Sequence, residues 1–300
     1  MLVERHADAV KVRAPAKVNL FLEVLAKRPD GYHDITTLMV AVNLYDTLVF
    51  KEESSGLVRL SCDHPGLSTG PDNLVLRAAE TLRRYTGSTR GASIQLAKRI
   101  PMAAGLAGGS TDAAATLTGL NRLWALGLTA HEMAAIGAEI GSDVPFFFST
   151  PAAWCTGRGE QTTPWPLGRT LHLVLVCPPA GLSTAEVYRG VIVPEIPESG
   201  EEVRQAAADG NVEEIGRRLH NRLQPVAERL CPPVAALYRR LVQFGAAGQL
   251  MSGSGASLFA LCRDHGEALR LARELRAGAG EAQAGAGTGA IQVFVVQSCS

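Results

Sequence analysis

The alternation of hydrophobic and polar positions predicts a β-rich beginning of the chain. Residues 11–26 alternate apolar and polar side chains, a Pro-Asp-Gly sequence follows at residues 29–31, and further apolar runs occupy residues 38–42 and 47–50. A period of two is typical of strands, and Pro-Asp-Gly is typical of a tight turn. This part of the chain is therefore expected to be rich in β-hairpins.

Helices and strands are both predicted in the rest of the chain. Helical patterns occur at residues 73–86, 110–126, 201–208, 211–223, 233–244 and 264–276. Short apolar runs predict strands at residues 93–96, 171–177, 249–251, 258–261 and 291–297. Thr129 and Glu132 have the spacing of a capping box, which predicts one more helix that ends near Gly141.

These elements indicate an α+β protein in two halves. A stretch rich in Pro, Gly, Thr and Trp near residues 150–170 predicts the boundary, and we expect domains at residues 1–160 and 161–300. Residues 277–290 consist almost wholly of Ala, Gly, Gln, Glu and Thr, a composition that predicts a flexible surface loop.

Composition narrows the class of protein. The 300 residues are 46% hydrophobic and carry 29 basic and 29 acidic side chains, a balance that disfavours a broad nucleic-acid-binding surface. No apolar run approaches the ~20 residues of a membrane span, and the first residues lack the hydrophobic region of a signal peptide. The six cysteines form no Cys-x-x-Cys pair, which disfavours a zinc or redox site. We expect a cytoplasmic protein without nucleic-acid or membrane partners.

Residues 101–114, with the sequence PMAAGLAGGSTDAA, form a glycine-rich segment that leads directly into a predicted helix. Glycines let backbone N–H groups approach an anion, and a helix N-terminus adds free donors and a positive dipole end. The segment therefore predicts a polyphosphate site. It is not a Walker A loop, because Ser110 rather than Lys follows Gly109, and it has no G-x-G-x-x-G spacing. Taken alone, it also fits a loop that only lets a helix pack closely.

Four further segments contain polar residues that the fold alone does not require. They are Lys17 and Asn19 on one face of a predicted strand, Tyr32 and His33 after the turn, Asp143 before an apolar run, and the glycine-rich residues 252–257. Singly, they also fit a solvated strand face, a plain turn, a helix cap and a hairpin turn. Together, a phosphate loop, a Lys, an Asp and a second loop are the parts of a phosphoryl-transfer site.

Three of these segments, at residues 14–21, 101–114 and 251–257, resemble in order and spacing the signature motifs of the GHMP kinase superfamily. That superfamily includes galactokinase, homoserine kinase, mevalonate kinase and phosphomevalonate kinase. The sequences KRPDGYH at 27–33 and GSDVPFF at 141–147 are similar to the branch that phosphorylates diphosphocytidyl methylerythritol. Further matching pieces are DNLV at 72–75, TGRGE at 156–160 and STAEVY at 183–188, so the resemblance covers nearly the whole chain.

The resemblance implies a fold and a reaction. The N-terminal domain is expected to resemble domain 2 of ribosomal protein S5, the C-terminal domain to be a ferredoxin-like α+β sandwich, and the active site to lie in the cleft between them. ATP, with Mg²⁺, would donate its γ-phosphate to the C2 hydroxyl of the methylerythritol unit, in the non-mevalonate route to isoprenoids. Asp143 would act as the base that takes the hydroxyl proton, and Lys17 would lie beside it.

The resemblance also implies binding residues. Those for ATP are Asn73 and Lys98 near adenine and Pro101, Ala103, Ala104, Gly105, Leu106, Ala107, Gly108, Gly109, Ser110 and Thr111 around the triphosphate. Ser110 is the candidate Mg²⁺ ligand. Those for the substrate are Asn19, Tyr32, His33, Asp143, Thr184, Tyr188, Gly253 and Ser254, with the two tyrosines expected to stack on the cytosine. The expected partner is one small molecule, a cytidine diphosphate sugar alcohol, and the protein is expected to be a monomer or weak homodimer.

Some alternatives stay open at this point. The acceptor could be another small alcohol such as homoserine or mevalonate, although these present no base for Tyr32, His33 and Tyr188 to bind. A non-catalytic ATP-binding regulator is disfavoured by the presence of both Lys17 and Asp143. Ala107 stands where many relatives carry Gly, which a phosphate loop tolerates if this position does not need a positive φ.

Overall fold

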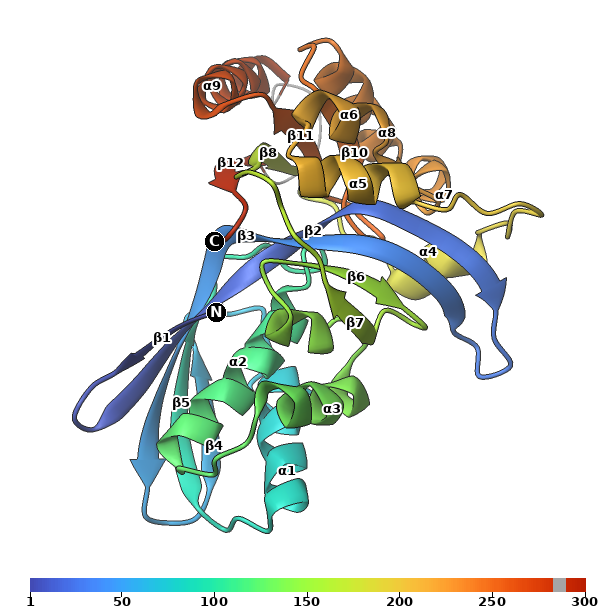
Figure 1. Ribbon diagram of the computed structural model, residues 1–300. Coiled ribbons are helices and arrows are strands. Elements are labelled where there is room, and N and C mark those ends of the chain that lie inside the picture. Colours follow the sequence, from blue (N-terminus) through green and yellow to red (C-terminus); the bar gives the residue numbers. More distant parts are fainter. Residues whose placement is uncertain (283–289) are drawn as a thin grey trace.

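Two β-sheets with helices packed against them form the molecule (Figure 1). The computed structural model describes residues 1–282 and 290–300. The strands are β1 (Leu2–Arg5), β2 (Ala9–Lys27), β3 (His33–Glu53), β4 (Val58–Cys62), β5 (Gly91–Ala97), β6 (Ala152–Thr156), β7 (Gln161–Pro164), β8 (His172–Cys177), β9 (His220–Asn221), β10 (Gly248–Met251), β11 (Leu258–Cys262) and β12 (Gln292–Gln297). The helices are α1 (Leu74–Thr86), α2 (Gly108–Leu123), α3 (Ala130–Ile140), the 3₁₀-helix η1 (Pro145–Phe148), α4 (Thr184–Arg189), α5 (Glu201–Asp209), α6 (Val212–Arg217), α7 (Gln224–Leu230), α8 (Pro232–Val242) and α9 (His265–Ala282).

The larger sheet is built on the long antiparallel hairpin of β2 and β3. Its strand order is β1-β2-β3-β5-β4, with β6 paired to β3, β7 paired to β6, and the short β9 parallel to β2. The register of β2 against β3 shifts between Pro15 and Ala16 and again between Asn19 and Phe21. Such irregularities bend a strand and redirect its side chains. Here they bracket the stretch of β2 that carries the candidate catalytic lysine.

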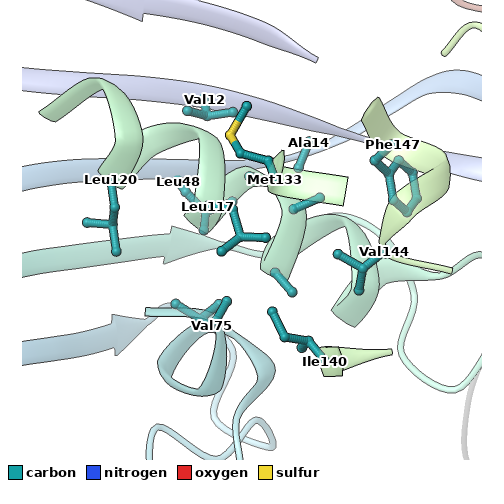
Figure 2. Packing of buried hydrophobic residues seen from close by; sticks show 14 of the residues in the cluster. Val12, Ala14, Leu48, Val75, Leu117, Leu120, Met133, Ile140, Val144 and Phe147 are labelled. Atoms are coloured by element: carbon teal, nitrogen blue, oxygen red, sulfur yellow. The ribbon is translucent and has the colours of Figure 1, made fainter. Parts of the chain in front are cut away.

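Helices α1, α2 and α3 pack on this sheet and form the first hydrophobic core (Figure 2). Leu117 of α2 is completely buried in the same cluster as Val12 and Leu48 of the sheet. Burial of one such side chain contributes about 1.5–3 kcal/mol. Helix α2 also approaches the sheet closely at Gly119, where a Cβ atom would lie 2.3 Å from the ring of Phe50. The body of α2 is therefore fixed to the sheet, which leaves its N-terminus to face a ligand.

The smaller sheet is antiparallel, in the order β10-β11-β8-β12, and is covered by α6, α8 and α9 (Figure 1). Several contacts join the two halves of the molecule, and two of them pair backbone strands. Strand β9, which leads toward α7, pairs with Phe21 and Leu22 of β2, and a bridge links Val42 with Ser298. Residues from the two halves are thereby brought to one cleft.

Most predicted elements are confirmed, including the α+β class and the capping box of α3. The two apolar runs at 38–42 and 47–50 belong to the single strand β3. The helix predicted at 211–223 is wrong beyond Arg217, because residues 220–221 leave the helix to pair with β2. Helix α9 continues to Ala282, so the loop predicted from residue 277 is wrong at its start, and residues 283–289 lie outside the described part.

Several short elements were not predicted, namely β1, β4, β6, β7, β9, η1, α4 and α7. Strand β7 pairs with β6 in the larger sheet, and β8 is the first strand of the smaller one. The predicted division into residues 1–160 and 161–300 stays a prediction. Across the described ranges, no helix combines the length and apolar character that crossing a bilayer requires.

Candidate active site

A cleft of about 1360 Å³ gathers nearly all the residues predicted for the site. The predicted residues that line it are Lys17, Asn19, Tyr32, His33, Asn73, Lys98, Pro101, Ala103, Ala104, Gly105, Ala107, Gly108, Gly109, Ser110, Asp143, Thr184, Tyr188, Gly253 and Ser254. Leu106 and Thr111 do not line it, because their side chains are buried in the interior. Any contact of these two residues with a ligand would come from the backbone.

The glycine-rich loop turns the chain from β5 into α2 through left-handed backbone. The φ angle is +50° at Ala103, +73° at Gly105 and +56° at Ala107. Ala107 is the N-cap of α2 and makes no side-chain capping hydrogen bond, so the N–H groups ahead of Thr111 have no helical partner. Alanine at position 107 was expected to be tolerated if this position did not need a positive φ. The structure shows that it does need one. The left-handed conformation of an alanine costs about 1–2 kcal/mol, which the surrounding contacts must offset.

Lys17 lies at the bottom of the cleft with its side chain only 3% exposed. Its ammonium group donates to Asn19 Oδ1 at 2.7 Å and to the carbonyl of Gly105 at 3.0 Å. Asn19 in turn donates to Thr37 Oγ1 at 2.8 Å. Burial lowers the pKa of Lys17, whereas the negative charge of Asp143 raises it. The solvated strand face considered from the sequence is excluded, because this lysine is buried and oriented by hydrogen bonds.

Asp143 lies opposite Lys17, in the turn between α3 and η1. Its Oδ2 is 3.9 Å from Lys17 Nζ, and its side chain is 32% exposed. The N-cap of η1 is Val144, without a side-chain hydrogen bond, so Asp143 does not cap that helix. Its carboxylate is therefore accessible from the cleft and has a cation beside it.

The second glycine-rich loop, residues 252–257, packs directly on the first. Ser252 Oγ donates to the carbonyl of Gly105 at 2.9 Å, and a Cβ atom on Gly105 would lie 2.1 Å from the carbonyl oxygen of Ser252. A Cβ atom on Gly253 would lie 3.1 Å from Lys17 Nζ. Ser254 Oγ is 2.8 Å from Thr184 Oγ1, which joins this loop to the start of α4. The loop thus supports the phosphate loop and Lys17 from the opposite half of the molecule.

Asn221 and Gln224 hold the second loop, and sequence reasoning did not find either residue. The buried amide of Asn221 donates to the carbonyls of Met251 at 2.7 Å and Gly253 at 2.8 Å. Gln224 Oε1 accepts from the N–H of Met251 at 2.9 Å. Both residues lie inside the segment predicted as one helix or directly after it. The signal that locates them is the pairing of β9 with β2, which links residues about two hundred positions apart.

Lys98 lies behind the phosphate loop rather than free in the cleft. Its ammonium group pairs with Asp46 and, at 2.8 Å, with Asp112 of α2. Burial lowers the pKa of Lys98, but these two carboxylates outweigh it and raise the pKa overall. Asp46 also accepts from the N–H groups of Arg99 and Ile100 at 2.6 and 2.9 Å. Lys98 therefore fixes the start of the loop to α2, and its role toward adenine stays a prediction.

Asn73, the other residue predicted near adenine, is the N-cap of α1. Its Oδ1 accepts from the N–H of Val75 at 2.9 Å, and its Nδ2 donates to the carbonyl of Ser68 at 2.6 Å. The side chain thus holds the loop before α1 against the cleft, and contact with adenine stays a prediction.

Aromatic residues gather at the far end of the cleft. The rings of His33 and Tyr188 have centroids 5.3 Å apart and planes tilted by 31°. Burial, followed by the charge of Lys27, lowers the pKa of His33, and burial raises the pKa of Tyr188. Tyr32 is 53% exposed. Since the rings of His33 and Tyr188 already touch, a base cannot enter between these two. The predicted stacking of the cytosine on Tyr32 and Tyr188 stays a prediction.

The donor set of the cleft fits Mg²⁺ only as a partner of phosphate oxygens. Within the described ranges no cluster of three or more His, Cys, Asp or Glu side chains could hold a metal by itself. Ser110, in the first turn of α2, lines the cleft beside the loop. Mg²⁺ commonly keeps several waters and binds substrate phosphates with few protein ligands, so one hydroxyl at this place is compatible with it.

Comparison with known families matches both halves of the chain. Residues 73–150 match the family described as GHMP kinases N terminal domain, and residues 203–280 match GHMP kinases C terminal. These matches agree with the two-part fold and with the glycine-rich loops that meet in the cleft.

Individual proteins are similar over most of their length. The chain is 38% identical to a 4-diphosphocytidyl-2-C-methyl-D-erythritol kinase of Alkaliphilus metalliredigens, over 86% of this chain and 90% of that protein. It is 42% identical to the kinase of the same name in Gloeobacter violaceus, over 87% and 88%. A crystal structure of 4-(cytidine 5'-diphospho)-2C-methyl-D-erythritol kinase superposes with a TM-score of 0.77 at 33% identity, covering 97% of this chain and 100% of that one. Homoserine kinase of Cytophaga hutchinsonii, at 18% identity and a TM-score of 0.76 over 100% and 97%, shares the fold.

Proposed function

This chain belongs to the family of 4-diphosphocytidyl-2-C-methyl-D-erythritol kinases, and from that premise we propose that Lys17 and Asp143 carry out its phosphoryl transfer. The enzyme is an ATP-dependent GHMP kinase. It phosphorylates the C2 hydroxyl of 4-diphosphocytidyl-2-C-methyl-D-erythritol, giving the 2-phosphate and ADP in the non-mevalonate isoprenoid pathway. The observation that supports the proposed pair is its geometry: an accessible carboxylate 3.9 Å from a buried ammonium, at the bottom of the cleft.

Asp143 is the proposed general base. An alcohol is a weak nucleophile, and a positioned base that takes its proton during attack contributes typically 10²–10⁴-fold in rate. The Asp143 carboxylate is accessible from the cleft and does not cap η1. A C2 hydroxyl placed against its Oδ atoms can therefore transfer its proton as the oxygen attacks the γ-phosphate.

Lys17 is the proposed electrostatic partner. Two of its three N–H groups are taken by Asn19 and the carbonyl of Gly105, which fixes the direction of the third. The charge lies beside both Asp143 and the phosphate loop, so it can offset negative charge on the transferring phosphoryl group. Because the ammonium group is held before substrate arrives, little reorganisation is needed during the reaction.

The triphosphate is proposed to bind the loop at residues 101–107 and the free N–H groups at the start of α2. The dipole of α2 favours an anion there by up to about 2 kcal/mol. Mg²⁺ would be held by phosphate oxygens with the Ser110 hydroxyl as its candidate protein ligand, and it would neutralise charge on the phosphates. The cytoplasmic location and the monomer or weak homodimer expected from the sequence stay predictions.

Acceptor-dependent release of ADP tests the proposed function. The purified protein is mixed with Mg-ATP and, in parallel, with diphosphocytidyl methylerythritol, mevalonate or homoserine. Release with the cytidine substrate alone supports the assignment. Release with another alcohol would keep the catalytic pair but contradict the roles of Tyr32, His33 and Tyr188. ATP binding without release for any alcohol would favour a regulator.

A further inference from the structure

The substrate of the proposed function must span the cleft. Its acceptor hydroxyl is placed at Lys17 and Asp143, and its cytosine at His33 and the two tyrosines, so the diphosphate that joins the two must cross the space between them. Each phosphate carries a negative charge, and a charged group brought into a cleft needs a compensating partner. None of the residues discussed so far supplies a cation at this place.

The turn at residues 157–159, between β6 and β7, reaches both ends of the cleft. At the acceptor end, a Cβ atom on Gly159 would lie 3.9 Å from Asp143 Oδ1. At the cytidine end, the guanidinium carbon of Arg158 lies 4.9 Å from the centroid of the Tyr32 ring. Arg158 lines the cleft and its side chain is 27% exposed. Its guanidinium group therefore stands along the path that a diphosphate would take from one end to the other.

The position of Arg158 is held mainly through its backbone. Its N–H donates to Glu160 Oε2 at 2.6 Å, which fixes the turn. Its Nε, however, is 3.8 Å from Glu160 Oε1, longer than a hydrogen bond. The ring of Tyr32 supports the face of the guanidinium, and a guanidinium donates from its edge. The side chain is thus oriented but is not saturated by its carboxylate neighbour.

Other cations that line the cleft are less suited to this task. Lys17 and Lys98 are nearly buried, and each already donates to two protein oxygens. Lys27 pairs across the hairpin with His33, and Arg189 follows Tyr188, so both stand at the cytidine end. Among the cations that line the cleft, Arg158 is the one that lies between the two ends: the adjacent Gly159 is close to Asp143, and the guanidinium lies over Tyr32.

We propose that Arg158 binds the diphosphate of the substrate and thereby selects a cytidine diphosphate compound over one that lacks the phosphates. This role rests on the proposed function, because it assumes that the two ends of the cleft are occupied as described. A planar guanidinium can donate two parallel hydrogen bonds to phosphate oxygens. Hydrogen bonds to charged groups of this kind change affinity by about ten- to a hundredfold.

The test uses the full-length protein and three probes that differ only in phosphate: cytidine, CMP and CDP. Dissociation constants are measured by calorimetry for the wild type, Arg158→Gln and Arg158→Lys. Arg273→Gln, which changes an exposed residue of α9 outside the cleft, is the matched control. We expect Arg158→Gln to weaken CDP binding about ten- to a hundredfold while cytidine binding changes by less than about twofold. Arg158→Lys should fall between, since it keeps the charge but loses the planar fork.

The outcomes separate this proposal from the proposed function. Equal weakening of cytidine and CDP would mean that Arg158 only supports Tyr32, and unchanged CDP binding would mean that it does not touch the phosphates; either result overturns the proposal alone. A wild type that binds none of the three probes would overturn the proposed function as well. In steady-state kinetics the same variant should raise KM for the diphosphocytidyl substrate and leave KM for ATP and kcat nearly unchanged.

Discussion

The two ends of the cleft are built in different ways. At the acceptor end, Lys17 and Gly105 are held against residues 252–257 so tightly that no side chain fits at position 105. At the cytidine end, Tyr32 is 53% exposed at the tip of a hairpin, and Tyr188 lies on α4, a helix of only six residues. One end is fixed by the packing of the two glycine-rich loops, and the other combines an exposed hairpin tip with the contacting rings of His33 and Tyr188.

This difference matches the two tasks. Phosphoryl transfer depends on charges placed before the reaction begins, since a displacement of about 1 Å can cost on the order of 10²-fold in rate. Binding of a flat base tolerates small shifts, because stacking has no strict direction. Changes at the acceptor end should therefore lower kcat, and changes at the cytidine end should raise KM for the substrate.

Apart from loss of the base itself, the largest effect is expected from Lys17→Met, which keeps the length of the side chain but removes its charge. Loss of one preorganised donor to a developing charge costs about 10²–10³-fold in kcat, whereas the buried apolar chain should be tolerated by the fold. The loss in the rate of phosphoryl transfer is measured by single-turnover kinetics with saturating ATP and substrate. An increase in KM alone would mean that Lys17 contributes binding only, and the contrast between the two ends would disappear.

Asn221→Ala tests whether the acceptor end is held from the smaller half. The substitution leaves the carbonyls of Met251 and Gly253 without their donor, which should lower the free energy of unfolding by about 2–4 kcal/mol and lower kcat as Gly253 shifts from Lys17. Urea unfolding and turnover measure the two effects. Asn211→Ala, which removes the N-cap of α6, is the control: it should cost about 1 kcal/mol with normal kcat. Equal kcat for both variants would contradict the supporting role of Asn221.

Tyr188→Ala tests the cytidine end. Base–aromatic stacking is worth about 1–3 kcal/mol, so KM for the diphosphocytidyl substrate should rise about 10–100-fold while kcat and KM for ATP stay near normal. Tyr188→Phe keeps the ring and should behave like the wild type. If both variants leave KM unchanged, Tyr188 only packs against His33 and the base binds elsewhere.

The smallest effect is expected from Ala107→Gly. Glycine removes the cost of the left-handed φ of +56° but adds freedom to the unfolded chain, so we expect a gain of about 0.5–1 kcal/mol in stability with little change in kcat. Ala125→Gly, at φ +54° in an exposed turn outside the cleft, is the matched control and should stabilise similarly. A loss of stability at position 107 alone would show that its methyl group supports the phosphate loop.

Local patterns predicted the elements that carry the chemistry. The alternation in β2, the periodicity of α1 and α2 and the capping box of α3 depend on neighbouring residues, and each is present in the structure. The residues that the motif resemblance implied line the cleft, Leu106 and Thr111 excepted. Such features depend on interactions between residues that are close in sequence, and they can therefore be predicted from the sequence.

Contacts between distant segments were not predictable in the same way. Asp46 pairs with Lys98, which lies 52 positions later, and Asn221 reaches the loop at Gly253 only because β9 joins β2. The left-handed φ of Ala107 also has no local signal, since alanine disfavours it. Tertiary contacts of this kind override local preference.

The most direct test of the catalytic pair is the rate of the chemical step in Asp143→Asn. The substitution keeps the shape of the side chain and removes the base, so single-turnover transfer from ATP to diphosphocytidyl methylerythritol should slow by about 10²–10⁴-fold while the dissociation constants of ATP and CDP stay within about threefold of the wild type. A folded Asp143→Asn protein with near-normal transfer would contradict the assignment of Asp143 as the base, and with it the central claim.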